Sequence, residues 1–123
     1  MCIWAVGITP VTGVMLTAAA DKTIRLWQSG KCKTLVRDAH DAVIRALCIQ
    51  SQDRFFTCDN GGVVKHWTMD VDTHQLNCLS SVATNNDFIY SMTLIKEEEE
   101  EESTAWAVGG EQSGIIVYRN NKA

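Results

Sequence analysis

The chain has 123 residues, of which 46% are hydrophobic, and a formal net charge of −4. This length and composition fit one globular domain that is able to bury a core. Because an acidic chain offers no basic face to a phosphate backbone, nucleic acid is excluded as the expected partner and protein partners are favoured.

The cysteines are odd in number and include no Cys-x-x-Cys pair; they are Cys2, Cys32, Cys48, Cys58 and Cys78. Such a set could hold a metal or a disulfide, but it is more typical of reduced, buried thiols that pack as small hydrophobic residues in strands. We therefore expect no metal, no cofactor and a reducing compartment, the cytoplasm or the nucleus.

The segment 1–20 carries no charge and ends in three alanines, as a secretory cleavage site does. It lacks a basic start, however, and Pro10 and Gly13 interrupt its apolar run. We therefore expect no signal peptide. We also expect no membrane span, since no stretch is long and apolar enough to cross a bilayer.

Short runs with period-two alternation, separated by turn residues, predict β-strands along the whole chain. The expected strands are 2–8, 14–19, 23–28, 32–37, 44–50, 54–58, 63–68, 75–81, 89–95, 104–109 and 115–119. Tight turns group them into two four-stranded antiparallel sheets and one sheet of three strands. The bounds of these sheets are 2–37, 44–81 and 89–119, and an acidic loop at 96–103 lies in the last.

One layout of residues returns along the chain. It runs from Thr17 to Trp27, again from Thr57 to Trp67 at a spacing of 40, and a third copy ends in Tyr118 after a further 51 residues. Repeats of about 40 to 45 residues with four strands each are typical of β-propeller blades. The predicted fold class is therefore all-β, with about three antiparallel blades of a propeller, the last one lacking its outer strand.

The chain resembles WD40-repeat proteins, whose blades end in a run similar to residues 20–27 (ADKTIRLW) and 29–32 (SGKC). A narrower similarity, to successive blades of a ubiquitin-binding adaptor family, covers 21–32, 39–41, 44–47 and 88–92. The resemblance implies a propeller that binds ubiquitin and serves ubiquitin-dependent protein degradation. It implies a link to a hexameric AAA ATPase, valosin-containing protein, only indirectly, through a domain outside these 123 residues.

The number of blades limits what the chain forms alone. Propellers close with about four to eight blades, so about three blades make an open arc. The resemblance implies that the chain is a fragment of a larger closed propeller, and the missing blades come either from a longer chain or from self-assembly. Because an open arc exposes apolar sheet at both ends, we expect an isolated monomer to be poorly stable.

Six consecutive glutamates, Glu97 to Glu102, lie between the first and second strands of the third blade. Like charges repel and cannot be buried together, so the run is expected to be a solvated loop tip. It is either an acidic docking segment for a basic partner or a disordered insertion that explains the longer third repeat.

The resemblance also implies a buried relay in each blade, made of a His before the blade, a Ser or Thr on its second strand, an Asp in the next turn and a Trp on its third strand. Such polar groups are costly to bury unpaired, so they come as a set. By position, the second blade has His40, Thr57 and Trp67, but Gly61 stands where the Asp would be. Asp59 is a candidate substitute.

The other two blades depart further from this pattern. The first has Thr17, Asp21 and Trp27, and its His would precede Met1. The third has Asn85 at the position of the His and Tyr in place of Trp, and keeps no clear relay. These departures weaken the relay and leave the fold prediction unchanged.

Two pairs could carry catalysis instead, His40 with Asp41 and Cys58 with His66. Adjacent residues do not form a dyad, and the sequence has no Gly-rich phosphate loop, Ser elbow or His-x-x-x-His spacing. We therefore predict a non-catalytic protein-interaction module. The alternatives are a generic WD40 scaffold for another complex and a cysteine or histidine hydrolase.

The predicted binding surface is the top face of the propeller, where the loops cross between blades. Trp4, Arg45 and Tyr90 occupy equivalent positions at the start of the three innermost strands, and these residue types are enriched in binding hot spots. Alternatively, the two aromatic residues pack in the core and the arginine is merely solvated. Loops predicted to rim the same face carry Asp41, Asp59, Asn60 and Asp87.

Overall fold

The computed structural model describes residues 3–9, 13–70, 72–84, 89–95, 105–110 and 114–119. These residues form strands and loops only, and they include no helix long and apolar enough to cross a membrane. The strands are β1 (Ile3–Ile8), β2 (Met15–Ala19), β3 (Ile24–Gln28), β4 (Lys31–Val36), β5 (Ile44–Ile49), β6 (Arg54–Asp59), β7 (Val63–Met69), β8 (Leu76–Ala83), β9 (Ile89–Ile95), β10 (Ala105–Gly110) and β11 (Gly114–Arg119). Each expected strand is present, and its bounds differ from the expected ones by at most two residues.

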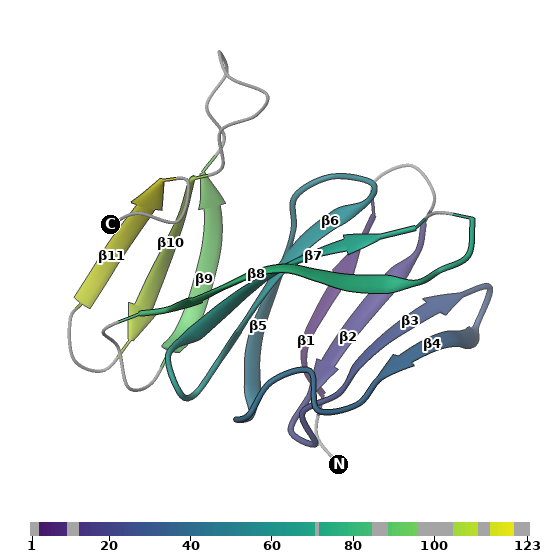
Figure 1. The fold of residues 1–123 in the computed structure, drawn as a ribbon, viewed down its shortest axis with the longest axis horizontal. Helices are drawn as coiled ribbons and strands as arrows, with labels where there is room; N and C mark the ends of the chain where they lie inside the picture. Colours follow the sequence, from purple (N-terminus) through teal and green to yellow (C-terminus); the bar gives the residue numbers. More distant parts are fainter. Residues whose placement is uncertain are drawn as a thin grey trace.

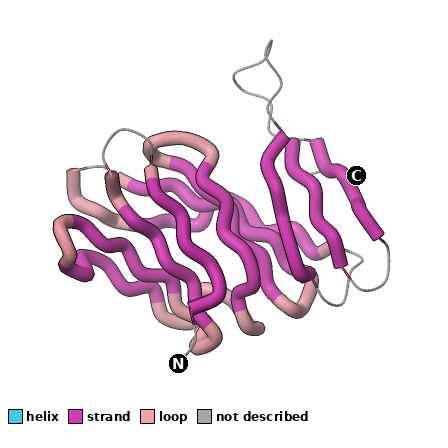
Figure 2. Tube along the Cα trace, turned by 180° about the vertical axis from the view of Figure 1, so that it is seen from behind, coloured by secondary structure: helices cyan, strands magenta, loops and turns pink. Residues whose placement is uncertain are grey.

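The strands form three antiparallel sheets in which each strand pairs with the next in sequence (Figure 1). We call them blade 1 (β1 to β4), blade 2 (β5 to β8) and blade 3 (β9 to β11). The first strand of each blade is innermost, and β5 packs against both β1 and β9. The blades therefore stand one after another as an open arc (Figure 2), which confirms the prediction of an all-β partial propeller.

Tight turns within the blades follow from local sequence. Ser29 and Gly30, between β3 and β4, have φ angles of 54° and 75°, as a two-residue hairpin turn with the twist of a sheet requires. Between β2 and β3, the Asp21 carboxylate accepts hydrogen bonds from the Thr23 backbone N–H (3.2 Å) and hydroxyl (2.5 Å). This Asx turn fixes the start of β3.

The main core lies between blades 1 and 2. Buried side chains of blade 1, among them Leu16 and Leu26, pack against Ile44, Phe55 and Trp67 of blade 2. Gly7 allows β1 to approach β5 closely, since a Cβ atom there would lie 2.6 Å from Leu47 Cδ2 and 2.8 Å from Ile49 Cγ1. The absence of a side chain at this position thus sets the spacing of the two blades.

Each of the first two blades has one face that carries its tryptophan. Directly paired residues share a face, and the pairs Val6–Thr17 and Ile8–Met15 lead through β3 to Trp27. The matching face of blade 2 carries Phe55 and Trp67 and is covered by blade 1. No described sheet covers the tryptophan face of blade 1, which we call the open face.

Candidate functional site: a buried relay beneath three strand bulges

The loop between blades 1 and 2 brings His40 into the core of blade 2. Ahead of the histidine, the Ala39 backbone N–H donates to the Lys22 carbonyl (2.9 Å), and the Ala39 carbonyl accepts from Lys65 Nζ (2.8 Å). These two bonds tie the loop to both blades. They hold the imidazole against β6, where only 1% of the residue surface is exposed.

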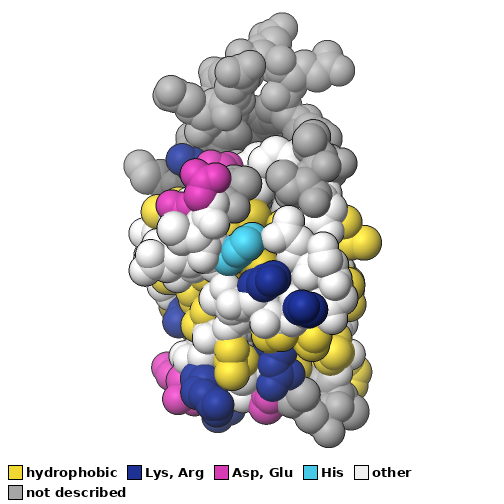
Figure 3. Space-filling view, turned by 90° about the vertical axis from the view of Figure 1, so that its right-hand side faces the viewer, with side chains coloured by type: hydrophobic (Ala, Val, Ile, Leu, Met, Phe, Trp, Pro, Cys, Tyr) yellow, Lys and Arg dark blue, Asp and Glu magenta, His cyan; other side chains and the backbone are white. Residues whose placement is uncertain are grey.

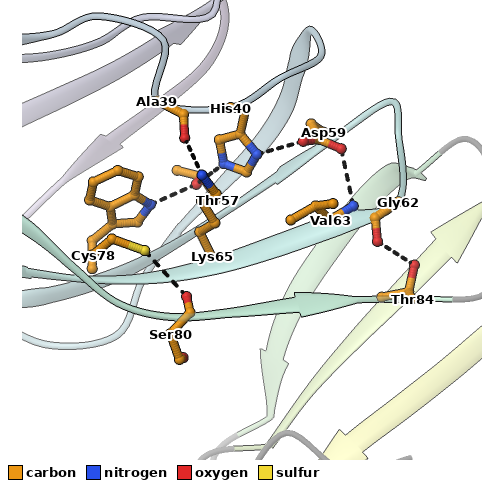
Figure 4. A network of polar contacts seen from close by, with 11 residues as sticks. Ala39, His40, Thr57, Asp59, Gly62, Val63, Lys65, Cys78, Ser80 and Thr84 are labelled. Atoms are coloured by element: carbon orange, nitrogen blue, oxygen red, sulfur yellow. Dashed lines mark hydrogen bonds and ion pairs between the residues drawn. The ribbon is translucent and has the colours of Figure 1, made fainter.

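His40 joins three other buried side chains in a chain of hydrogen bonds (Figure 4). Its Nδ1 lies 2.7 Å from Asp59 Oδ2, and its Nε2 lies 2.6 Å from Thr57 Oγ1. The Trp67 indole N–H donates to the same Thr57 oxygen over 2.9 Å. The structure therefore brings together the three residues expected for this relay, with Asp59 as the acid.

Each hydrogen-bond donor of this relay faces an acceptor. A carboxylate only accepts, so Nδ1 of His40 carries a hydrogen and donates it to Asp59. The indole N–H of Trp67 occupies one lone pair of the Thr57 hydroxyl, and the rest of that hydroxyl, one hydrogen and one lone pair, is free to pair with Nε2 of His40. Every buried polar group of the relay has a partner, which is what a low-dielectric interior requires.

Asp59 fills the role that the turn aspartate was expected to play, two residues upstream of Gly61. Its second oxygen accepts the Val63 backbone N–H at 3.0 Å. Burial raises the pKa of Asp59, whereas the hydrogen bonds from His40 and Val63 lower it. The hydrogen bonds have the larger combined effect, so the pKa lies below its usual value of 3.8. A Cβ atom at Gly61 would lie 3.3 Å from Asp59 Oδ1, so the glycine leaves room for this carboxylate.

Blade 1 has only part of the relay. The Trp27 indole N–H donates to Thr17 Oγ1 at 3.0 Å, as in blade 2. Asp21, however, is exposed and serves the turn after β2, and its carboxylate also lies 3.7 Å from the Arg25 guanidinium. The Thr23 hydroxyl is the main cause that holds the pKa of Asp21 below its usual value.

Above the relay, each innermost strand begins with a bulge. The pairing of β1 with β2 skips Trp4, that of β5 with β6 skips Arg45, and that of β9 with β10 skips Tyr90. A bulge re-aims the side chain of its extra residue and often lies beside a functional site. The three predicted contact residues thus occupy one structural position, although the side chain of Tyr90 lies outside the described residues.

The first two bulge residues touch each other. The Arg45 guanidinium carbon lies 4.7 Å from the centre of the Trp4 ring, within the range of a cation–π contact. The Trp4 residue remains 51% exposed. It is therefore not a core residue, and its ring contributes to the exposed surface beside Arg45.

The predicted rim residues fall into different environments. Asp41 is exposed, and Asn60 is half-buried near the bulge of β5, where its backbone N–H donates to the Val43 carbonyl at 2.9 Å. Asp59 is only 1% exposed and belongs to the relay, so it is removed from the predicted contact surface. Asp87 lies outside the described residues.

The groups considered for catalysis have other partners. His40 bonds Asp59 and not its neighbour Asp41. His66 stacks on Phe56 with ring centres 4.0 Å apart and bonds Gln50 over 2.8 Å, and burial lowers its pKa. Burial also raises the pKa of Cys58 to about 12, so this thiol is protonated near neutral pH.

No family model matches the chain. Among curated proteins, it is 38% identical over 96 residues to "Ubiquitin fusion degradation protein 3 homolog" of Caenorhabditis elegans. This match covers 76% of the chain and 11% of the relative, so the chain spans about a tenth of that protein's length.

Two solved structures have the same arrangement of strands. The WD40 beta propeller domain of Doa1 superposes with a TM-score of 0.67 at 25% identity, over 93% of this chain and 40% of that one. A computationally designed protein, Ika8, superposes with a TM-score of 0.74 at 21% identity, over 98% of this chain and 34% of that one. The second likeness shows the fold alone.

These likenesses agree with the two four-stranded antiparallel sheets, in which each strand pairs with the next in sequence. The chain is a partial WD40 β-propeller. Within that class, it resembles the propeller of phospholipase A2-activating protein.

Proposed function

We propose that this chain forms part of a non-catalytic, protein-binding propeller of the cytoplasm or nucleus, and that its partner is ubiquitin. One observation carries the proposal: three neighbouring inner strands each have a bulge at the same register position, and the bulges hold Trp4, Arg45 and Tyr90. These are the residue types that dominate binding hot spots. The Caenorhabditis elegans relative, named for the degradation of ubiquitin fusions, supports ubiquitin as the partner.

The contact between Trp4 and Arg45 suits this role physically. An arginine stacked on an indole loses little further freedom when a partner binds, so the entropic cost of association falls. The half-exposed indole offers apolar area, and the neighbouring guanidinium offers N–H donors at its edge. Together they form a small rigid anchor for a partner surface that mixes aliphatic and polar groups.

A titration tests the proposal. Labelled ubiquitin is titrated with the unaltered chain and followed by NMR, after far-UV circular dichroism has established a folded β-rich sample. We expect saturable shifts. A Trp4→Ala, Arg45→Ala double variant should bind at least about tenfold more weakly, since truncation of each hot-spot residue costs more than about 1 kcal/mol and about 1.4 kcal/mol corresponds to tenfold.

The matched control is Leu79→Ala, which removes an exposed hydrophobic side chain from the outer strand β8, away from the bulges. It should bind ubiquitin as the unaltered chain does. Equal loss of binding in the control would contradict the bulge residues as the contact surface. Absence of shifts with a folded sample would contradict ubiquitin as the partner. Retention of other protein partners in that case would favour a generic WD40 scaffold.

A further inference from the structure

The outer edge of blade 2 is strand β8, which carries no charged side chain over its eight residues. Among the described strands β8 pairs with β7 alone, so its other edge has no strand beside it. The blades contact one another through their inner strands, as β5 does with β1 and β9. Any further blade would stack on a face of blade 1 or blade 3 and would leave the edge of β8 on the outer rim of the propeller.

Strand β4 is the outer edge of blade 1 and has the same local structure. The pairing of β3 with β4 skips Lys33, and the pairing of β7 with β8 skips Leu79. The residue before each skipped position is a cysteine that pairs with the tryptophan of its blade. Its thiol donates to the carbonyl two residues further on, over 3.5 Å from Cys32 and over 3.4 Å from Cys78. The two edges thus differ mainly in their side chains.

The side chains of β4 oppose the addition of another strand, and those of β8 do not. Exposed lysines are a common protection of edge strands, and β4 exposes Lys31 and Lys33. Lys and Arg side chains gather on this side of the molecule, which faces right in Figure 1 (Figure 3). On β8, Leu79 is 50% exposed, and the exposed residues Ser81 and Ala83 are small. The edge of β8 therefore offers apolar contact and room for the side chains of an added strand.

Hydrogen bonds fix both ends of β8. At its start, the His74 backbone N–H donates to the Asp70 carbonyl (2.8 Å), and the Thr34 hydroxyl of β4 donates to the His74 carbonyl (2.6 Å). At its end, the backbone N–H and the hydroxyl of Thr84 both donate to the Gly62 carbonyl, at 2.8 Å and 2.7 Å. A strand that is already held in place loses little further freedom when a partner pairs with it, so the entropic cost of association falls.

We propose that β8 accepts a strand from a partner protein, an extended and uncharged β-prone segment that pairs antiparallel with β8 and carries a Lys or Arg at its C-terminal end. Antiparallel pairing places that end beside the start of β8, where Asp70 and Asp72 are exposed in the preceding turn, so the charges are complementary. In this mode of recognition main-chain hydrogen bonds supply affinity, while side chains beside Leu79 and the charge at the end supply selectivity. This contact is separate from the bulges of the innermost strands and does not depend on ubiquitin binding.

A synthetic peptide tests the proposal by NMR on the unaltered, ¹⁵N-labelled chain. The probe alternates Thr and Val, ends in two lysines and has an amidated C-terminus. We expect saturable shifts of the backbone amides of β8 and slower hydrogen exchange along that strand. The same peptide with a methyl group on every backbone nitrogen has no main-chain donors, so it should not bind.

Leu79→Lys gives β8 the side chain that β4 has at the same register position. It should weaken peptide binding at least about tenfold, because the added strand would meet a charge in place of an apolar contact. Leu35→Lys is the matched control, since it makes the same change at an exposed leucine of β4 and should leave the affinity unchanged. Far-UV circular dichroism should find both variants folded.

The acidic end of the edge has its own variant. Asp72→Asn should weaken binding of the lysine peptide by about two- to fivefold, as expected for an exposed ion pair. It should not affect a peptide that ends in two glutamines instead.

A folded chain without saturable shifts, shifts confined to other strands, or equal binding of the methylated peptide would overturn the proposal. So would an unchanged affinity in Leu79→Lys or Asp72→Asn, or an equal loss in Leu35→Lys. Sedimentation velocity tests the other occupant, since a dimer of the unaltered chain that Leu79→Lys converts to a monomer would assign the edge to a second copy of the chain and would also overturn the proposal.

Discussion

Blades 1 and 2 share one local device but differ in how they complete it. In both, a threonine on the second strand accepts the indole N–H of a tryptophan ten residues later, at 3.0 Å in blade 1 and 2.9 Å in blade 2. Only in blade 2 do a histidine and a carboxylate extend this pair, and only there is the tryptophan face covered by another described sheet.

The difference separates what a blade does alone from what its neighbour supplies. The Thr–Trp bond needs only one hairpin, because both residues lie on adjacent strands. His40, in contrast, comes from the loop that follows blade 1 and is anchored by bonds to both blades. The complete relay is therefore a property of the junction between blades.

The largest expected difference between the two blades is in the stability lost when the tryptophan of each is replaced by alanine. Trp67→Ala should lower the free energy of unfolding by about 3–5 kcal/mol, because Trp67 is almost fully buried and its loss leaves a cavity. Trp27→Ala should cost clearly less, because half-buried Trp27 lies on the open face. Urea unfolding at one fixed protein concentration measures both; equal losses would contradict the comparison.

The second largest difference is expected between Asp59 and Asp21, in the stability lost when each is replaced by asparagine. Asp59→Asn removes the charge from a buried hydrogen bond and should cost about 1.5–3 kcal/mol. Asp21→Asn changes an exposed turn residue and should cost less than about 1 kcal/mol. The same urea experiment compares them, and a larger effect at Asp21 would show that the turn aspartate is the more important acid.

Gly7 tests the junction itself. Gly7→Val would force a side chain against Leu47 and Ile49, where a Cβ atom alone would lie within 2.9 Å of both. We expect a loss of about 1–3 kcal/mol from overpacking. The loss should be accompanied by faster hydrogen exchange of the indole N–H of Trp67, while unchanged exchange would show that β1 does not control the cover of blade 2.

Acid should weaken the junction through Asp59. Its pKa is lowered in the folded state, so its stabilising contribution is complete above the ordinary carboxyl range and is lost as the pH falls through the lower folded value. Between about pH 5 and pH 2, the unaltered chain should lose more stability than Asp59→Asn. Thermal unfolding followed by circular dichroism across this range measures how steeply the stability of each protein falls with pH. Equal pH dependence in the two proteins would exclude Asp59 as the cause of the acid sensitivity.

The sequence predicted the strands well because alternation and turn residues act locally. Thr17, Trp27, Thr57 and Trp67 were found from their repeated spacing, while the hydrogen bond within each pair was implied by the resemblance to WD40 proteins. Asp59 was only a candidate for the acid of the relay, because its hydrogen bond to His40 depends on how the loop between the blades folds back over β6. A signal was present in Gly61, whose lack of a side chain leaves room for the displaced acid.

Other features depend on tertiary contacts that no local pattern reveals. The equivalence of Trp4 and Arg45 was expected, but their direct contact requires β1 and β5 to lie side by side. Asp59 was also expected at the rim, since a loop acid is usually exposed, and its burial came from the bond to His40. A side chain at position 7 is likewise excluded only by Leu47 and Ile49, which lie forty or more positions further along the chain.

The most direct test is to locate the proton on His40 by long-range ¹H–¹⁵N NMR near neutral pH. The geometry predicts a proton on Nδ1, donated to Asp59, in the unaltered chain, and a changed Nδ1 signal in Asp59→Asn. A bare Nδ1 with the proton on Nε2 would contradict the relay, because a lone pair would then face the carboxylate across 2.7 Å.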